Sequence, residues 1–422
     1  MDTSSPPSRP FQPNRQARRV SASVAAPLRI AVYSQDGFGL GHLRRTTLIG
    51  QSLLEQAPDS AVLLLADSPV APFFQLPQGM DCIKLPSILK VDAGKWRPVS
   101  LHVGVADLRR LRADVLHCAL RSFAPDLLLV DHMPGGVQGE LVPSLAALRR
   151  EYPRCRIVLG LRDILDASPV IARVWQDEGA YEALRTFYDA VLIYGSQDVF
   201  DAAAIYELPA LREGIHYCGY VANPSNVQPA WAVRHRLQVA DGRLVFVSAG
   251  GGGDAHQLMR TYLHALRWLG PRVDFASVLA VGANAPSELQ AELCNEADGL
   301  PVRIVPFVED SLSVIAAADL MVCMAGYNTL AEVLRVGRRA LVVPRAGPSA
   351  EQRMRSQLFL ERGLVDVVFP EELSPQRLAE RMLDGLERNG STTAAARVDT
   401  SGLGNVAGHL LRLAGAPVHA QA

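Results

Sequence analysis

The sequence has no excess of either charge. Its 422 residues include 42 lysines and arginines against 43 aspartates and glutamates, for a net charge of −1. No overall field would therefore attract a nucleic acid or an anionic membrane surface. Lysine itself is scarce, because arginine carries almost all of the positive charge and the only lysines are Lys84, Lys90 and Lys95.

Cysteine pairs and long apolar runs are also missing. The 6 cysteines are scattered without a CxxC pair, which argues against a zinc site or a disulfide framework and is typical of a reducing compartment. The longest apolar stretch, residues 312–325, contains Asp319 and is shorter than the ~18 residues that a membrane span needs. Residues 1–27 lack the apolar core of a secretory signal, so we expect a disordered tail there and a cytoplasmic protein.

From residue 28 the chain alternates short apolar runs with amphipathic stretches, which is typical of strands and helices in parallel α/β sheets. Strands are expected at 28–34, 61–66, 126–131, 156–161 and 190–195, and again at 243–249, 276–281, 302–307, 319–324 and 339–344. Between the two sets, residues 219–232 hold prolines and asparagines without periodicity, as in a linker.

This pattern predicts an α/β protein with two doubly wound, Rossmann-like domains facing a central cleft. We expect a tail at 1–27, a first domain at 28–220, a linker at 221–232, a second domain at 233–390, and a C-terminal helix and tail at 391–422. Ligands of such sheets bind beyond the carboxyl ends of the strands, so the cleft is the expected site.

A glycine-rich loop follows the first expected strand. It contains Gly39 and Gly41 and ends at His42. Alternating glycines allow a close backbone approach to a ligand, and the helix that follows offers its free N–H groups. A tight strand-to-helix turn is the alternative interpretation. A nicotinamide fingerprint does not fit, because His42 stands where its third glycine belongs and because Asp59 comes before the second strand, whereas the acidic residue of the fingerprint lies at the end of that strand.

The second domain opens with a longer glycine loop between a strand and a helix, formed by Gly250, Gly251, Gly252 and Gly253. No lysine follows it, so it is not a Walker P-loop. Four consecutive glycines cost conformational entropy, which makes a purely structural turn a poor explanation. We therefore expect the backbone amides of this loop to bind a diphosphate.

A third constellation opens a helix near the end of the second domain. Gly326, Asn328 and Thr329 precede Glu332. Thr329 and Glu332 also fit a capping box, which would be purely local, whereas a carboxylate facing the cleft would accept both hydroxyls of a ribose. Glu351 and Gln352 begin the next expected helix and are candidates for contacts with sugar hydroxyls.

Three residues are candidates for a catalytic base. His42 closes the first glycine loop, Asp131 ends a strand, and Asp163 follows the next strand. A histidine side chain accepts a proton from a hydroxyl near neutral pH. Each of the three also fits a loop-capping or helix-capping role, so the alternatives stay open.

Together these motifs resemble the GT-B glycosyltransferases of family 28, which include the lipid-linked N-acetylglucosaminyltransferase of peptidoglycan synthesis. The resemblance rests on GxGxGH at 37–42, GYNTLAEVL at 326–334 and ALVVPRAGPSAEQ at 340–352. It covers residues 28–390 and is nearest to an uncharacterised bacterial branch of predicted glycosyltransferases. It implies a GT-B fold and a part in bacterial polysaccharide or glycolipid synthesis.

The resemblance also implies a donor site for a UDP-sugar. Phe307 and Val308 would lie against the base, Glu332 would bind the ribose, and Arg345 would contact phosphate or an acidic sugar. Glu351 departs from the family's Gln-Gln pair for the sugar hydroxyls, so the resemblance leaves the donor sugar open. The full implied set is Gly39, Gly41, Gly250, Gly251, Gly252, Gly253, Phe307, Val308, Gly326, Asn328, Thr329, Glu332, Arg345, Glu351 and Gln352.

The chain contains no Asp-x-Asp pair, the metal-clamping motif of other glycosyltransferases. We therefore expect no metal and no other cofactor, with helix N-termini and backbone amides stabilising the leaving UDP. The implied reaction is an inverting transfer of the sugar to an acceptor hydroxyl.

The acceptor is left open. Residues 73–98 contain all three lysines, Trp96 and two phenylalanines, a mixture suited to a lipid-linked or anionic acceptor and to peripheral contact with the inner face of a membrane. An ordinary surface loop is the alternative. Two other functions also stay open: a nucleotide-sugar hydrolase on the same fold, and a non-catalytic nucleotide-sugar sensor.

Overall fold

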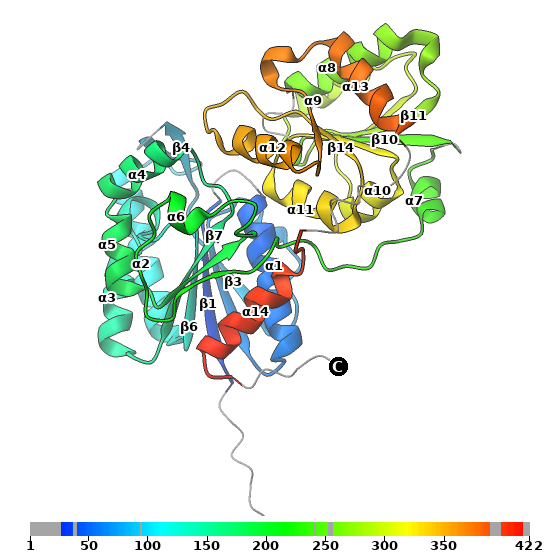
Figure 1. Cartoon of the computed structure of the whole chain (residues 1–422). Helices are drawn as coiled ribbons and strands as arrows, with labels where there is room; N and C mark the ends of the chain where they lie inside the picture. The colour runs from blue at the N-terminus through cyan, green and yellow to red at the C-terminus, as the bar shows by residue number, and fades with distance from the viewer. Residues whose placement is uncertain are drawn as a thin grey trace, which may run out of the picture.

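The chain forms two α/β domains (Figure 1), and the computed structural model describes residues 27–36, 40–92, 95–239, 242–251, 256–388 and 398–416. Apart from Pro27, the expected tail at 1–27 lies outside these residues, as do Gly39, Gly252 and Gly253. The prediction of an α/β protein with two doubly wound domains is confirmed.

The first domain is built on a seven-stranded parallel sheet with the order β3-β2-β1-β6-β7-β8-β9. Its strands are β1 (Arg29–Ser34), β2 (Ala61–Ala66), β3 (Met80–Lys84), β6 (Leu127–Asp131), β7 (Arg156–Arg162), β8 (Ala190–Tyr194) and β9 (Ile215–Tyr217). Strands β6 and β8 are buried at every residue, which explains their uninterrupted apolar sequence. The edge strands β3 and β9 were not predicted.

Helices cover both faces of this sheet. Ile30 and Val32 of β1 pack on the side of α1 (Gly41–Gln56), whereas Ala31 and Tyr33 pack on the side of α2 (Val105–Phe123). This alternation follows from the two-residue period of a strand. The remaining helices of the domain are η1 (Ala71–Phe73), η2 (Val137–Gly139), α3 (Val142–Glu151), α4 (Ser168–Asp177), α5 (Ala180–Phe187) and α6 (Ala202–Ile205).

An antiparallel hairpin stands apart from the sheet, formed by β4 (Ile88–Asp92) and β5 (Lys95–Pro98). Trp96 is 8% exposed and packs in a small core with Ile88, Leu108 and Val137. The segment 73–98 is therefore partly folded against the domain and is not an ordinary surface loop.

The second domain repeats the architecture with a six-stranded parallel sheet of order β12-β11-β10-β13-β14-β15. Its strands are β10 (Arg243–Ser248), β11 (Phe275–Ala280), β12 (Val302–Val305), β13 (Leu320–Cys323), β14 (Ala340–Val342) and β15 (Asp366–Val367). Its helices are α7 (Ala230–Arg236), α8 (His256–Leu269), η3 (Gly270–Arg272), α9 (Ser287–Glu296), α10 (Ser311–Ala317), α11 (Tyr327–Val336), α12 (Glu351–Glu361), η4 (Pro370–Glu372) and α13 (Pro375–Glu387).

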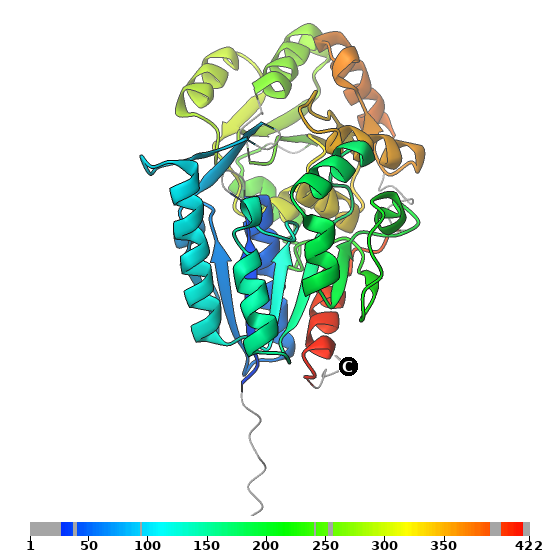
Figure 2. The same ribbon diagram turned by 90° about the vertical axis from the view of Figure 1, so that its left-hand side faces the viewer.

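The chain returns to the first domain at its end. Helix α14 (Gly402–Leu413) lies beside α1 in both ribbon views (Figures 1 and 2), far along the sequence from its neighbour. Leu403, Val406 and Leu410 are buried there in one core with Ile49 and Leu53 of α1. The C-terminal helix expected within 391–422 is thus part of the first domain's core.

Both sheets reverse their winding at the first strand, since β1 lies between β2 and β6, and β10 lies between β11 and β13. Such a switch point leaves a crevice at the carboxyl ends of the strands. The second domain stands above the first (Figure 2), and α14, which follows the second domain in the sequence, packs in the core of the first.

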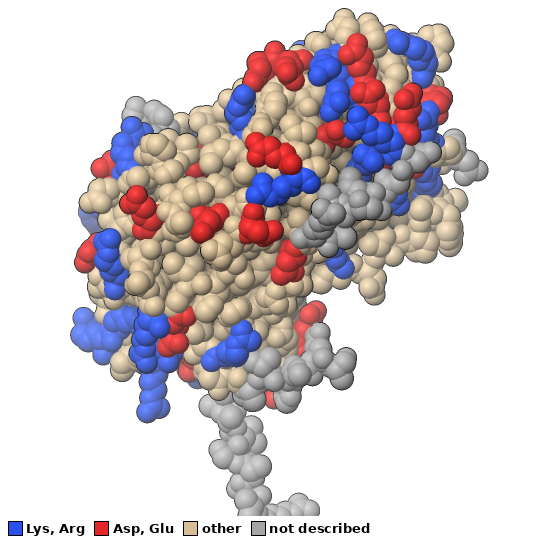
Figure 3. Space-filling model, viewed as in Figure 1, with Lys and Arg blue, Asp and Glu red and all other residues tan. Residues whose placement is uncertain are grey.

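The surface of the molecule carries mixed charge. On the face shown in Figure 3, acidic and basic side chains are interspersed over both domains. None of the described helices has both the length and the apolar character needed to cross a bilayer.

Candidate active site

A cavity of about 550 Å³ lies between the two domains, and we call it the interdomain cavity. Every described residue of the expected donor site lines it. These residues are Gly41, Gly250, Gly251, Phe307, Val308, Gly326, Asn328, Thr329, Glu332, Arg345, Glu351 and Gln352. The structure therefore brings together four sequence motifs from both domains, the first at Gly41 and the last at Gln352.

The glycine positions of this cavity lie at the switch point of the second sheet. Gly250 follows β10 with a φ of 72°, a conformation that favours glycine. Gly326 is the N-cap of α11 and makes no side-chain capping bond. The residues of the first turn, Tyr327, Asn328 and Thr329, line the cavity, and the first N–H groups of a helix have no partner within the helix. The capping-box alternative for Thr329 and Glu332 is wrong, because the helix begins one turn earlier than that motif requires.

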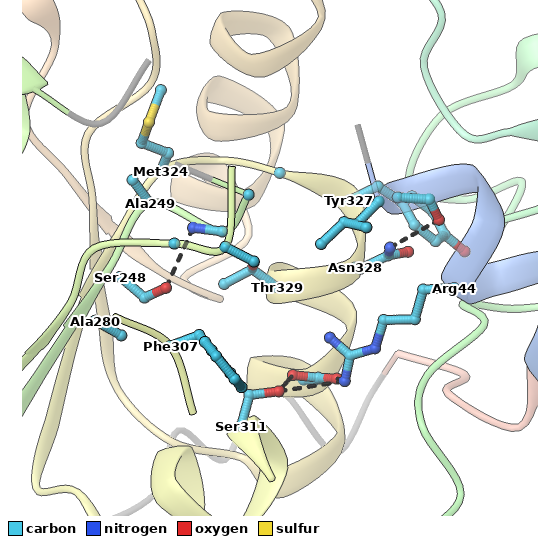
Figure 4. Close-up of a pocket in the computed structure, with 18 of the residues that line it drawn as sticks. Arg44, Ser248, Ala249, Ala280, Phe307, Ser311, Met324, Tyr327, Asn328 and Thr329 are labelled. Atoms are coloured by element: carbon cyan, nitrogen blue, oxygen red, sulfur yellow. Dashed lines mark hydrogen bonds and ion pairs between the residues drawn. The ribbon is translucent and has the colours of Figure 1, made fainter. Parts of the chain in front are cut away.

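Glu332 is buried beside α10 and faces a cation from the opposite domain (Figure 4). Its carboxylate accepts hydrogen bonds from Ser311 Oγ at 2.8 Å and from Arg44 Nη2 of α1 at 2.5 Å. Burial raises the pKa of Glu332, and the charge of Arg44 offsets only part of that effect. The carboxylate expected to bind a ribose is therefore in place, with Arg44 as its present partner.

The pair at the start of α12 lines the cavity and is hydrogen-bonded to neighbouring protein groups. Glu351 Oε1 accepts hydrogen bonds from Arg162 at 2.8 Å and from Arg355 at 2.9 Å. Burial would raise the pKa of Glu351, but the two guanidinium groups outweigh it and lower the pKa to about 2. Gln352 Oε1 accepts from the backbone N–H groups of Ala325 and Arg345, both at 3.2 Å. Both side chains hold neighbouring protein groups in position.

His42 and Asp131, predicted as separate candidates for the base, form one unit. Nδ1 of His42 bonds the carboxylate of Asp131, and Arg45 Nη2 donates to the same carboxylate at 2.8 and 3.0 Å. Burial would raise the pKa of Asp131, but Arg45 and His42 outweigh it and hold the pKa below its usual range. Arg45 Nη2 also lies 2.7 Å from Nδ1 of His42. In the tautomer with the proton on Nδ1, that nitrogen donates to Asp131 and Nε2 is the nitrogen that accepts a proton. No described residue bonds Nε2 of His42.

A metal does not fit this group well. His42, Asp131 and His132 place ligand atoms within 4.8 Å of one another, the one such group among the described residues. The guanidinium of Arg45 already lies on the Asp131 carboxylate, so a cation there would meet a second positive charge. His132 stacks on His42 with ring centroids 4.1 Å apart, and its burial together with the charge of His42 lowers its pKa.

Asp163 lies away from the cavity. Arg355 donates to both of its carboxylate oxygens, from Nη2 at 2.7 Å and Nε at 3.0 Å, and both side chains are almost fully buried. A carboxylate engaged in this way has no free oxygen directed at a substrate. These surroundings argue against Asp163 as the base and indicate a structural pair between the domains.

Sequence reasoning overlooked the arginines that bind the candidate carboxylates. Arg44 binds Glu332, Arg45 binds Asp131, and Arg162 and Arg355 bind Glu351. Spacing was the available signal: Arg45 precedes the buried Ile49 by one helical turn and so falls on the apolar stripe of α1. Arg355 likewise follows Glu351 at the i,i+4 distance of an ion pair.

Known proteins resemble this chain in part of the sequence and in the fold. Residues 244–405 match the model of the glycosyltransferase family 28 C-terminal domain. An uncharacterised glycosyltransferase of Methanopyrus kandleri is 26% identical over 207 residues, which are 48% of this chain and 56% of that protein. The UDP-N-acetylglucosamine–N-acetylmuramyl-(pentapeptide) pyrophosphoryl-undecaprenol N-acetylglucosamine transferase of Burkholderia vietnamiensis is 32% identical over 178 residues, 41% of this chain and 48% of that enzyme. The chain thus spans about half the length of these curated relatives.

Solved structures resemble almost the whole chain. MurG of Acinetobacter baumannii superposes with a TM-score of 0.59 at 16% identity, covering 92% of this chain and 100% of that one. A putative UDP-N-acetylglucosamine 2-epimerase of Listeria monocytogenes gives 0.60 at 14% identity, covering 92% and 95%. Since an epimerase shares the fold, the fold alone does not identify the reaction. Residues 244–405 therefore match the glycosyltransferase family 28 C-terminal domain, and the chain as a whole has the GT-B fold.

Proposed function

We propose that this protein is a metal-independent, inverting glycosyltransferase that moves a sugar from a UDP-sugar to an acceptor hydroxyl. One observation carries the proposal: His42, which bonds the buried Asp131, lines the same interdomain cavity as the described residues of the expected donor site. A base and a nucleotide-sugar site on one cavity are what a direct displacement at the anomeric carbon requires.

In the proposed donor site, each part of the nucleotide contacts a different feature of the second domain. The N–H groups at the start of α11 and the loop at Gly250 and Gly251 would hold the diphosphate. Glu332 would accept the ribose hydroxyls once Arg44 has moved aside. Phe307 is 56% exposed and lines the cavity, where it would cover the base.

The chemical step would use the histidine pair of the first domain. As the acceptor oxygen attacks the anomeric carbon, its proton passes to Nε2 of His42, and the bond from that carbon to the UDP oxygen breaks on the opposite face. Asp131 stabilises the resulting imidazolium, and Arg45 keeps Asp131 ionised. Helix N-termini and backbone amides would stabilise the charge that develops on UDP, which removes the need for a metal.

A thermal-shift panel with UDP, GDP, dTDP, CMP and NAD, each with magnesium or EDTA, tests the donor. At 100 times Kd, a ligand of the folded state adds about 2.7 kcal/mol to the free energy of unfolding. We expect a shift with UDP that EDTA leaves unchanged and that Glu332→Ala abolishes. A thermal shift with another nucleotide in place of UDP would mean that the donor carries that nucleotide. A shift that requires magnesium would contradict the proposal that the donor binds without a metal.

Product analysis separates a transferase from the other two functions. A UDP-sugar hydrolase would release UDP and free sugar at a rate that no acceptor changes, and a sensor would bind UDP without turnover. We expect UDP release that rises when an acceptor is added, with the sugar recovered on that acceptor.

A further inference from the structure

A buried ion network lies in the first domain, and the proposed reaction does not use it. Its centre is Arg112 of α2, which donates to both carboxylate oxygens of Glu140, from Nε at 2.7 Å and from Nη2 at 2.6 Å. Arg112 also donates from Nη1 to Asp67 Oδ2 at 3.1 Å. All three side chains are almost fully buried. A buried ion network contributes little more to stability than apolar residues of the same volume, so packing alone does not explain it.

Asp67 connects this network to the segment that follows β1. It comes directly after β2, and its Oδ1 accepts a hydrogen bond from the backbone N–H of Asp36 at 2.6 Å. Strands β1 and β2 are neighbours in the sheet, with Ser34 opposite Ala66, so the two aspartates meet at the carboxyl ends of adjacent strands. The carboxylate of Asp67 therefore has one oxygen on Arg112 and the other on the backbone of Asp36.

Asp36 in turn binds the start of α1. Its Oδ2 accepts hydrogen bonds from the backbone N–H of His42 at 2.8 Å and from that of Leu43 at 3.4 Å. Leu40, the N-cap of α1, makes no side-chain capping bond, so Asp36 takes the place of the usual capping residue. Two of the N–H groups that the sequence predicted to be free for a ligand are thus already bonded to a carboxylate.

The bond from His42 to Asp36 joins the two ends of the first glycine loop, since Asp36 precedes this loop and His42 ends it. His42 is therefore held at two points, because Asp36 binds its backbone N–H and Asp131 bonds its ring. A base must lie within hydrogen-bond reach of the hydroxyl that it deprotonates, and a displacement of about 1 Å can cost roughly 10²-fold in rate. The position of the His42 backbone thus matters to the reaction.

We propose that Asp67 and Asp36 are positioning residues that hold His42 for proton transfer, with the buried Arg112 as their anchor. This inference rests on the proposed function, in which His42 is the base. Asp67 orients the backbone of Asp36, and the side chain of Asp36 orients the backbone of His42. Arg112 keeps Asp67 in place and compensates its buried charge.

The same network has a second branch that offers a matched control. The buried hydroxyl of Tyr33 donates to Glu140 Oε1 at 2.7 Å. Tyr33→Phe removes this hydroxyl and leaves the bonds of Asp67 and Asp36 intact. If the network were purely structural, loss of a hydrogen bond from either branch would affect the protein alike. If it positions His42, only the Asp67 branch affects the reaction.

Steady-state kinetics and UDP titration test the role in the reaction. Asp67→Ala removes the acceptor of the Asp36 N–H, whereas Asp67→Asn keeps an acceptor oxygen and loses the ion pair with Arg112. We expect kcat to fall about tenfold or more in Asp67→Ala, about threefold in Asp67→Asn and less than about twofold in Tyr33→Phe. The affinity for UDP should stay within about twofold of the wild type in all three, since the nucleotide contacts come from the second domain.

Equal kcat values in Asp67→Ala and Tyr33→Phe would overturn the proposal. Circular dichroism and the unchanged UDP affinity show that the variants have folded. If Asp67→Ala does not fold, the comparison of Asp67→Asn with Tyr33→Phe decides in the same way.

Hydrogen exchange of single backbone amides, measured by NMR, tests the positioning without the reaction. We expect the His42 amide to exchange about tenfold or more faster in Asp67→Ala, because its bond to Asp36 opens more often, and at the wild-type rate in Tyr33→Phe. The amide of Ile49, in the middle of α1, is the internal reference, since it reports opening of the whole helix. Equal acceleration at His42 and Ile49 would mean that Asp67 acts on the stability of the helix, which would overturn the proposal.

The two measurements distinguish this inference from the proposed function. If the wild type transfers a sugar and Asp67→Ala transfers it equally fast, the positioning role is wrong and the proposed function stands. If the His42 amide responds as expected but the wild type transfers no sugar from a UDP-sugar, the proposed function is wrong and the positioning role falls with it.

Discussion

His42 lies at the centre of the chemistry because its ring is held on both sides. Asp131 bonds one nitrogen, and His132 stacks against the ring face. Asp131 is in turn bound by Arg45, which is 2% exposed. A base held by such a chain of contacts keeps its free nitrogen in one direction, which is the arrangement that favours proton transfer.

We expect His42→Ala to lower kcat by about 10²–10⁴-fold, the usual contribution of a general base. The affinity for UDP should change little, since the nucleotide contacts come from the second domain. Steady-state kinetics and UDP titration check the two quantities, with the exposed His102 replaced by alanine as the control. An equal loss of turnover and UDP affinity would contradict the assignment of His42 as the base.

Glu351 makes the stability of the protein depend on pH. Its pKa of about 2 in the folded state lies below the ordinary 4.5, so its carboxylate stabilises the fold fully above pH 4.5 and loses this contribution as the pH falls toward 2. Glu351→Gln removes the charge. We expect the variant to have a lower Tm than the wild type near pH 6, with a difference that narrows steadily below pH 4.5.

Thermal unfolding followed by circular dichroism at several pH values measures this difference. Glu361→Gln, at an exposed position of the same helix, is the control and should show no such trend. A gap between wild type and Glu351→Gln that stays constant from pH 6 to pH 3 would mean that the ion pairs with Arg162 and Arg355 do not lower the pKa.

At the scale of elements, helix α1 serves three purposes with its first turn. His42 bonds Asp131, Arg44 forms an ion pair with Glu332 in the second domain (Figure 4), and Arg45 forms an ion pair with Asp131. Successive residues of a helix point about 100° apart, so Arg44 and Arg45 reach different partners. The start of this one helix therefore connects the base to the donor domain.

Helix α14 packs against α1 in the core of the first domain. Leu410 is fully buried between the two helices and the sheet, in the same core as Ile49 and Leu53. We expect Leu410→Ala to lower the free energy of unfolding of the first domain by about 2–5 kcal/mol, since it leaves a cavity in a packed core. Urea denaturation measures this loss.

Arg412→Ala, at an exposed position of the same helix, is the control and should change stability by less than about 0.5 kcal/mol. A loss in Leu410→Ala no larger than in the control would mean that α14 contributes little to the first domain.

At the scale of the whole molecule, ion pairs and hydrogen bonds join the domains around the cavity. Arg355 binds Asp163 and Arg162 binds Glu351 across the interface, and the amide of Asn328 donates to the backbone oxygen of Gly41 at 3.0 Å. The pair of Arg355 and Asp163 is buried, so removal of one partner would leave an uncompensated charge. The pair of Arg44 and Glu332 is more exposed and occupies the proposed ribose site.

We expect Arg44→Ala to tighten UDP binding by up to about fivefold, because it removes a cation that competes for Glu332. A partly exposed ion pair contributes about 1 kcal/mol or less, which sets this limit. Calorimetric titration of UDP measures the change, and Arg44→Lys, which keeps the charge, should stay near the wild type. Weaker UDP binding in Arg44→Ala would show that Arg44 itself contacts the nucleotide.

The sequence by itself determined the features that depend on neighbouring residues. The apolar runs at 126–131 and 190–195 are recognisable because a strand covered on both faces has no polar side. The glycines at 250 and 326 are recognisable because each lies between a strand and a helix, and at Gly250 the φ of 72° favours glycine. The donor-site motifs of the second domain follow the strand ends of a single sheet, and for this reason they converge on one cavity.

Only the tertiary structure decided which charges meet. Asp131 and Asp163 looked alike in the sequence, since each follows a strand of the first sheet. Asp131 meets His42 and Arg45, whereas Asp163 meets Arg355 from the other domain. The placement of α14 on α1 was equally hidden. Pairings of this kind join residues up to several hundred positions apart, and they are selected by the packing of whole domains, which local propensity and periodicity do not encode.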